Sequence, residues 1–205
     1  ASIFMGKGEH DNAEQTMGNC FTLQAVVSIL ITAVLVRFGE KLLWSFGASE
    51  NTISYATEYL KIYSVGTIFV QLTLGMNAYI TAQGSAKIAM ITVMIGAACN
   101  IILDPIFIFV MDMGVAGAAL ATIISQGVSC IWVVSYLFGK KTTLRLKKQY
   151  LQIKPSVVLP CIALGAATFI MQVSESVISV AFNSSLLKYG GDVAVGAMTI
   201  LTSVM

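Results

Sequence analysis

The chain has 205 residues, of which 57% are hydrophobic and only 11% are charged, and its formal net charge is +2. Soluble domains carry about 25% charged residues, so this composition excludes an ordinary water-soluble domain. The net charge carries little information by itself, and we expect no nucleic-acid partner.

Long stretches of the chain contain no charge or one charge. A helix that crosses a bilayer needs about 20 mostly apolar residues. Isolated strands cannot span lipid and no barrel alternation is visible, so the spans are helices. The sequence therefore predicts an all-α, polytopic membrane protein with five full spans and a sixth that begins at Val193. The stretches with at most one charge are residues 15–36, 62–86, 88–111, 113–139 and 155–187.

In chain order, residues 1–14 are expected to form a polar loop, and the first helix runs to about residue 36. Residues 37–57 are expected to form a longer connection with one amphipathic piece. The second helix is predicted at 57–82 and the third at 88–111. The chain begins with Ala and ends inside an apolar run, so we expect an internal part of a longer membrane protein.

A very short turn, Asp112-Met-Gly114, separates the third and fourth helices. These two helices are therefore predicted to be antiparallel neighbours. The fourth helix opens with the small residues Gly114-Val-Ala-Gly117-Ala-Ala, which let helix backbones approach closely.

The loops at 1–14, 83–87 and 139–156 fall on one side of the membrane and hold eight of the twelve Lys and Arg residues. The positive-inside rule makes that side cytoplasmic. The basic segment 139–156 is interpreted as a cytoplasmic linker between an N-terminal lobe part (residues 1–138) and the start of a C-terminal lobe (residues 157–205). We favour a solvated, topology-setting linker over a lipid-headgroup or regulatory site.

The fifth helix carries the longest polar face. Its members recur at spacings of four, three, four and four residues, which places them on one side of an α-helix. Such a stripe would be costly against lipid, so we expect it to line a cavity or a helix contact. The stripe consists of Thr168, Gln172, Glu175, Ser179 and Asn183.

Three other helices carry shorter polar faces, and together the four faces predict a bundle around a wet interior. Small polar residues serve more often as bonds between helices than as ligand contacts, but we assign Gln71, Asn100 and Gln126 to the cavity lining. The shorter faces are Thr67, Gln71 and Gly75; Thr92, Gly96, Asn100 and Asp104; and Thr122, Ser125, Gln126 and Ser129.

Asp104 and Glu175 are the only charges inside their apolar stretches, and a charge at membrane depth usually has a function. From the cytoplasmic ends of their helices, they lie about 24 Å and about 28 Å along the helix axis. This depth suits carboxylates that take up H⁺ or Na⁺ from outside. The alternative for Asp104 is a helix cap before Pro105, and for Glu175 a structural hydrogen bond. We favour Glu175 as the coupling residue and as a Na⁺ ligand.

An intramembrane enzyme would need a nucleophile with a base, or a metal site. The single histidine, His10, lies in a predicted loop, so neither arrangement is available within the spans. The four cysteines lie inside apolar runs and are interpreted as small buried hydrophobic residues. We expect no catalytic residue and no cofactor other than the coupling ion.

Several segments, in order and spacing, resemble the multidrug and toxic compound extrusion (MATE) transporters, in their bacterial MepA/DinF-like branch. The segments are Gly6-Lys-Gly-Glu-His-Asp-Asn-Ala-Glu14, Gly47-Ala-Ser with Tyr59-Leu-Lys-Ile62, Ala82-Gln-Gly84 with Lys87-Ile-Ala-Met90, Asn100-Ile-Ile-Leu-Asp-Pro-Ile-Phe-Ile-Phe109 and Gly114-Val-Ala-Gly-Ala-Ala-Leu-Ala-Thr122.

The resemblance implies twelve helices in two six-helix lobes around a central cleft, of which this chain would hold the third to seventh and the start of the eighth. It also matches Glu175 and Asp104 to acidic residues of the family's seventh and fifth helices. The implied function is an antiporter of the bacterial cell membrane that exports cationic amphiphilic compounds in exchange for H⁺ or Na⁺ by alternating access.

The expected partners are membrane lipids and small cationic drugs or dyes, and the full-length protein is expected to be a monomer. A flippase of the same superfamily, which moves lipid-linked oligosaccharides, is the alternative. It would favour an arginine-rich cleft, whereas no Arg or Lys lies inside any of the five apolar stretches.

Overall fold

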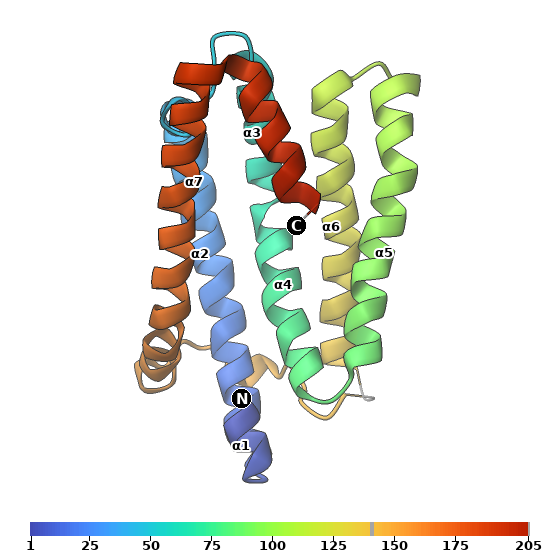
Figure 1. The fold of residues 1–205 in the computed structure, drawn as a ribbon. Helices are drawn as coiled ribbons and strands as arrows, with labels where there is room; N and C mark the ends of the chain where they lie inside the picture. The colour runs from blue at the N-terminus through green and yellow to red at the C-terminus, as the bar shows by residue number, and fades with distance from the viewer. Residues whose placement is uncertain (140–141, 205) are drawn as a thin grey trace.

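The computed structural model describes residues 1–139 and 142–204, without the side chains of residues 192, 203 and 204. The described residues form helices joined by short connections, with no strand among them, which confirms the all-α fold class (Figure 1). The elements in order are α1 (Ser2–Gly6), α2 (His10–Ser45), α3 (Ile53–Val65), α4 (Thr67–Ala82), α5 (Ala86–Pro105), the π-helix η1 (Ile106–Val110), α6 (Gly114–Phe138), the 3₁₀-helix η2 (Lys148–Tyr150) and α7 (Pro155–Val204).

Within the described residues, four helices are long and apolar enough to cross a membrane, and there are five if the bent pair of α3 and α4 is counted as one span. The protein is therefore a multi-pass membrane protein, as predicted. The fourth of these helices is Pro155–Gly191, the first part of α7. Gly191 has a φ of 64° and breaks α7 there. The apolar helix Val193–Thr202 follows, where the sixth span was predicted to begin.

Two segments that were predicted as connections are helical instead. Residues 10–14 of the predicted polar loop form the first turn of α2, and α2 continues through the predicted connection as far as Ser45. Polar and charged side chains do not stop a helix by themselves, whereas a residue at positive φ does. Gly47, at a φ of 91°, is the first such residue after α2 begins.

The second predicted span is bent by 57° between α3 and α4. At the bend, Thr32 Oγ1 on α2 donates a hydrogen bond to the carbonyl oxygen of Ser64 at 2.9 Å. Gly66 lies so close to α6 that a Cβ atom there would be 2.6 Å from Cγ1 of Ile123. A glycine at this position therefore lets α6 pack against the bend.

Helices α5 and α6 are antiparallel neighbours, which confirms the prediction from their short turn. Pro105 does not break the helix sharply. It lacks a backbone N–H, and the next five residues continue as the π-helix η1. Gly117 of α6 packs against η1, because its Cβ would lie 2.8 Å from the carbonyl carbon and oxygen of Phe107. The small residues that open α6 therefore allow close backbone contact, as predicted.

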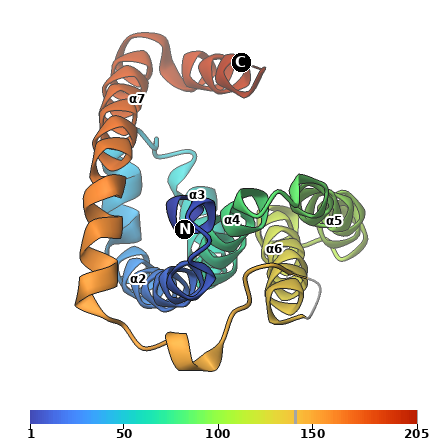
Figure 2. The same ribbon diagram turned by 90° about the horizontal axis from the view of Figure 1, so that it is seen from below.

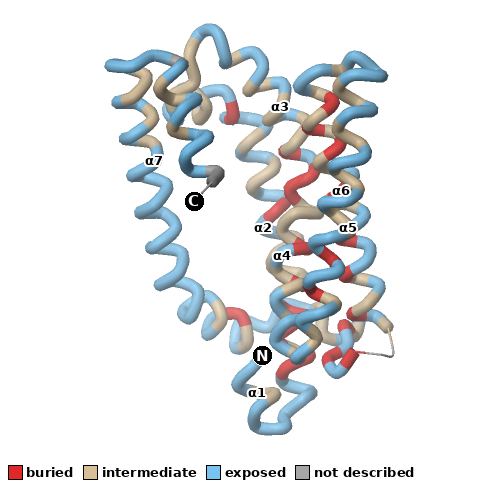
Figure 3. The backbone as a smooth tube through the Cα atoms, turned by 45° about the vertical axis from the view of Figure 1, so that its right-hand side comes forward, coloured by how far each residue is buried: buried red, intermediate tan, exposed pale blue. Residues whose placement is uncertain are grey.

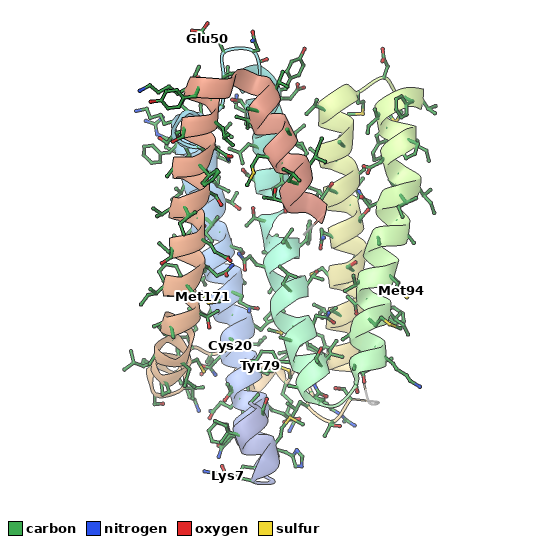
Figure 4. All side chains as sticks on the ribbon, in the orientation of Figure 1. Lys7, Cys20, Glu50, Tyr79, Met94 and Met171 are labelled. Atoms are coloured by element: carbon green, nitrogen blue, oxygen red, sulfur yellow. The ribbon has the colours of Figure 1, made fainter. Side chains whose placement is uncertain are left out.

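The connections lie at two ends of the molecule, and Figure 4 shows Lys7 and Glu50 at opposite ends. Residues 83–85 and 142–154 lie at the Lys7 end (Figure 1). This grouping agrees with the predicted alternation of sides, and the assignment of the Lys7 end to the cytoplasm stays a prediction. The two lysines at 140–141, counted among the basic residues of that side, lie outside the described residues.

The apolar core lies at the Lys7 end, where α2, α4 and α6 meet (Figure 3). Residues 142–154 contribute to it, so this part of the linker is not the solvated connection that the sequence suggested. Helix α7 is mostly exposed and packs beside α2, away from α5 (Figure 2). The large buried side chains of the core are Met17, Met76, Ile80, Val133, Leu137, Leu144 and Leu146.

Candidate functional site

Polar side chains of α4, α5 and α6 converge on one cavity of about 290 Å³ inside the membrane-spanning bundle. The cavity exists because each helix turns a polar stripe of four-residue period toward the other two. Asn100 and Gln126, which were predicted as lining residues, both line it. The polar and glycine residues of the lining are Thr73, Asn77, Thr92, Gly96, Asn100, Thr122, Ser125, Gln126 and Ser129.

Asp104 lies one helical turn beyond Asn100 on α5. The side-chain amide of Asn100 donates a hydrogen bond from Nδ2 to Oδ1 of Asp104 at 3.2 Å. Both side chains are half-buried. The alternative role of Asp104 as a helix cap is wrong, because it lies inside α5 and no side chain caps the start of η1. Its second oxygen, Oδ2, has no hydrogen bond to the described residues and is available to another group.

Two buried polar atoms at the cavity have no hydrogen-bond partner among the described residues. They are Oδ1 of Asn77, whose Nδ2 donates to the carbonyl oxygen of Ala89 at 3.3 Å, and Oγ of Ser125. A buried polar atom without a partner costs about 1–3 kcal/mol. Water or a ligand in the cavity would remove that cost, so the site favours a polar occupant.

The polar stripe of the fifth predicted span lies on α7, and no other described helix covers it. Thr168, Gln172, Glu175 and Ser179 are exposed, whereas Asn183 is half-buried and lies next to Gly47. The wet interior is therefore built by three helices of the described chain and not by four. Glu175 has no hydrogen bond or ion pair with the described residues.

The structure does not bring the two predicted carboxylates together. Asp104 is on α5 and Glu175 on α7, on opposite sides of α2 (Figure 2). The described residues also contain no group of three or more His, Cys, Asp or Glu side chains that could hold a metal ion. A Na⁺ ion at Glu175 or Asp104 would therefore need hydroxyl, amide or carbonyl oxygens as its other ligands.

Gln71 does not line the cavity, and sequence reasoning missed Thr73 and Asn77, which do. These two residues are four apart on α4, so they share one face of the helix. The predicted face of α4 began two residues earlier and therefore points about 200° away. Gly75, on that predicted face, instead packs against the amide of Gln24 on α2.

The family model described as MatE matches residues 1–106 of the chain. Among curated proteins, the chain is similar to the "Multidrug export protein MepA" of Staphylococcus haemolyticus (strain JCSC1435). The two are 30% identical over 165 residues, which cover 80% of this chain and 36% of that protein. The protein of the same name in Staphylococcus aureus (strain MRSA252) is 25% identical over 185 residues, which cover 89% of this chain and 41% of that protein. The chain thus spans well under half the length of these relatives.

Among solved structures, the chain resembles the MATE multidrug transporter DinF-BH in complex with R6G, with a TM-score of 0.92 and 35% identity. The alignment covers 98% of this chain and 45% of that chain. It also resembles the inward-facing conformation of a multidrug resistance MATE family transporter of the MOP superfamily. There the TM-score is 0.88 at 25% identity, over 97% of this chain and 45% of that chain.

Proposed function

The chain belongs to the MatE family of membrane transporters, and from that premise we propose that a full-length protein containing it is a secondary active antiporter. It exports amphiphilic cations in exchange for H⁺ or Na⁺ by alternating access. The observation that carries this proposal is the Asn100–Asp104 pair, next to a polar cavity in an otherwise apolar bundle. The family consists of transporters and not of enzymes.

The chemistry of exchange follows from the properties of a carboxylate at membrane depth. An ionised carboxylate attracts a cationic substrate, whereas a carboxylate that holds a proton or Na⁺ has lost that attraction. The two cations therefore compete for one charge. Asp104 Oδ2 is the oxygen at which H⁺ or Na⁺ would bind, because Oδ1 already accepts a hydrogen bond from Asn100.

Glu175 is proposed as a second carboxylate of the same kind on α7. Support for this comes from its isolation within an apolar helix and from the polar side chains one turn away on the same face. Its partners would have to come from helices outside the described chain, since no described residue binds it.

Small molecules are the proposed substrates, and membrane lipids are the surrounding partners of a monomer. Support comes from the multidrug export relatives and from the DinF-BH structure in complex with R6G. The cavity lining, as far as the structure describes it, contains no lysine or arginine. That lining fits a cationic substrate better than the anionic phosphates a flippase would carry.

The test uses a full-length protein with this chain, reconstituted in liposomes, and follows efflux of R6G under a proton gradient or a sodium gradient imposed separately. We expect efflux with one gradient and none without a gradient. Asp104→Asn and Glu175→Gln should each lose gradient-driven efflux, while Glu50→Gln, in the exposed connection between α2 and α3, should keep it. Wild-type efflux by both variants, or efflux without either gradient, would overturn the proposal.

A further inference from the structure

Residues 142–154 form a segment, here called the strap, that connects α6 to α7 and lies against the Lys7 end of the helices. Leu144 is 0% exposed and Leu146 is 3% exposed, so both belong to the apolar core. The backbone N–H of Leu146 donates to the carbonyl oxygen of Leu137 on α6 at 2.9 Å. Two leucines therefore anchor the strap in the core, although it has almost no regular secondary structure and many of its other residues are exposed.

Polar side chains from α2 and from the turn after α4 bind the strap backbone. Oε1 of Gln83 accepts the N–H of Leu144 at 3.0 Å. Asn19 accepts the N–H of Lys154 through Oδ1 at 2.6 Å and donates from Nδ2 to the carbonyl oxygen of Tyr150 at 3.2 Å. A segment without a helix or a sheet must satisfy its backbone in this way when it is buried.

Among the described residues, Glu14 is the only buried carboxylate that forms an ion pair. The residue is 5% exposed, and its Oε2 lies 2.5 Å from Nζ of Lys147. Its Oε1 accepts the backbone N–H of Arg145 at 3.0 Å. Nζ of Lys147 also lies 3.6 Å from Oδ1 of Asp11, which is on α2 like Glu14. A buried carboxylate is stable only when it is paired and hydrogen-bonded, and here both of its oxygens are held by the strap.

Gly18 provides the space for this contact. A Cβ atom at Gly18 would lie 2.6 Å from the carbonyl oxygen of Tyr150. The strap therefore touches α2 at backbone distance, which leaves no room for a side chain between them.

The next element is held much less firmly. The N–H of Lys154 is the last strap group bound by α2, and Pro155 follows, which has no N–H to donate. Beyond it, Val158 is still buried and α7 packs beside α2, but most side chains of α7 are exposed (Figure 2). The hydrogen bonds from side chains of α2 to this part of the backbone therefore end at Lys154, directly before Pro155.

We propose that the strap is a latch that fixes residues 2–139 and 142–154 into one rigid body, with the Glu14–Lys147 pair as its lock, and that the hinge toward α7 lies at Lys154–Pro155. This inference rests on the proposed function, in which one bundle rocks against another around the binding site. A hinge confined to two residues transmits such a movement from one bundle to the other. A free linker as long as the strap would absorb it.

The test measures hydrogen–deuterium exchange of residues 142–154 in the full-length protein. We expect strap amides in the wild type to be as protected as those of α6. Glu14→Ala should speed their exchange by about tenfold or more, because a hydrogen bond to a charged group contributes at least that factor to local opening. Lys147→Met, at a partly exposed side chain, tests the lock with little risk to folding. Glu9→Ala is the matched control, because the side chain of Glu9 bonds only Asn12 in the described structure.

R6G efflux is measured on the same variants. Fast strap exchange in the wild type would overturn the proposal, and so would normal efflux by a Glu14→Ala protein whose strap has been released. Reduced efflux that returns with the charge-swapped pair Glu14→Lys and Lys147→Glu would support it. These results are distinct from failure of the proposed function, which would show as absent efflux in the wild type.

Discussion

Gly117→Ala should destabilise the α5–α6 pair, while Gly127→Ala on the same helix should not. A Cβ atom at Gly117 would lie 2.8 Å from two backbone atoms of Phe107 and 3.1 Å from the backbone nitrogen of Ile108. These atoms belong to η1, so no side chain can rotate away and the two helices must separate. At Gly127 the nearest atoms are ring carbons of Phe69 at 3.9 Å, an ordinary contact.

The magnitude follows from two opposing terms. Overpacking a tight contact costs about 1–3 kcal/mol, and replacing a helical glycine with alanine stabilises by about 0.5–1 kcal/mol. The second term is common to both variants and cancels when they are compared. Gly117→Ala should therefore be less stable than Gly127→Ala by about 1–3 kcal/mol, which is about 2–4 °C in Tm for each kcal/mol in a unit of this size.

The assay is thermal unfolding of the full-length protein in detergent, followed with a thiol-reactive dye. Cys99 on α5 and Cys130 on α6 report when this helix pair opens. A Tm of Gly117→Ala equal to or above that of Gly127→Ala would show that the backbone contact between α6 and η1 does not exist in the protein.

Thr32→Val removes the hydrogen bond that Thr32 donates to the carbonyl oxygen of Ser64 at the bend between α3 and α4. This change should lower the free energy of unfolding by about 0.5–1.5 kcal/mol in the same melting assay. The hydrogen bond with Glu14 raises the pKa of Lys147. The contribution of this pair to the free energy of unfolding is therefore complete below the unfolded pKa of about 10.4 and is lost above the folded pKa. Strap protection, corrected for intrinsic exchange, should therefore be constant through neutral pH and fall in strong alkali.

The spans were predictable because the membrane itself sets the pattern that marks them. A stretch of about 20 residues without charge has few other uses, and the turn at 112–114 is too short to join anything but antiparallel neighbours. The ends of α2 were not predictable in the same way. The chain from His10 to Ser45 contains enough polar residues to resemble two loops, but no residue at positive φ interrupts it before Gly47.

The site was predictable on α5 and α6, where regular helices keep a polar face in phase from end to end. Prediction failed on α4 because this helix carries polar residues on two different faces. A stripe counted from Thr67 is out of register with the face that α4 turns toward α5, so Gln71 was chosen in place of Thr73 and Asn77. Neither the sequence nor the structure identifies partners for Glu175, because its face of α7 meets no described helix.

Figure 4 places Cys20 and Tyr79 on facing helices near the end that carries the strap, while Glu50 marks the far end. Between these ends, two glycine contacts frame the polar cavity of α5 and α6. A Cβ at Gly96 would lie 2.6 Å from Oγ of Ser129, and one at Gly117 would lie 2.8 Å from the backbone of Phe107.

Asn100, Thr122 and Ser125 lie on the two helices between those contacts and line the cavity, which also reaches Gly96 and Ser129 at the first contact. The second contact exists because Pro105 cannot donate a backbone hydrogen bond and the chain after it widens into η1. Asp104 directly precedes Pro105 and lies one turn beyond Asn100, which lines the cavity. Gly117→Ala accordingly tests the backbone contact between α6 and η1 without changing a residue that lines the cavity.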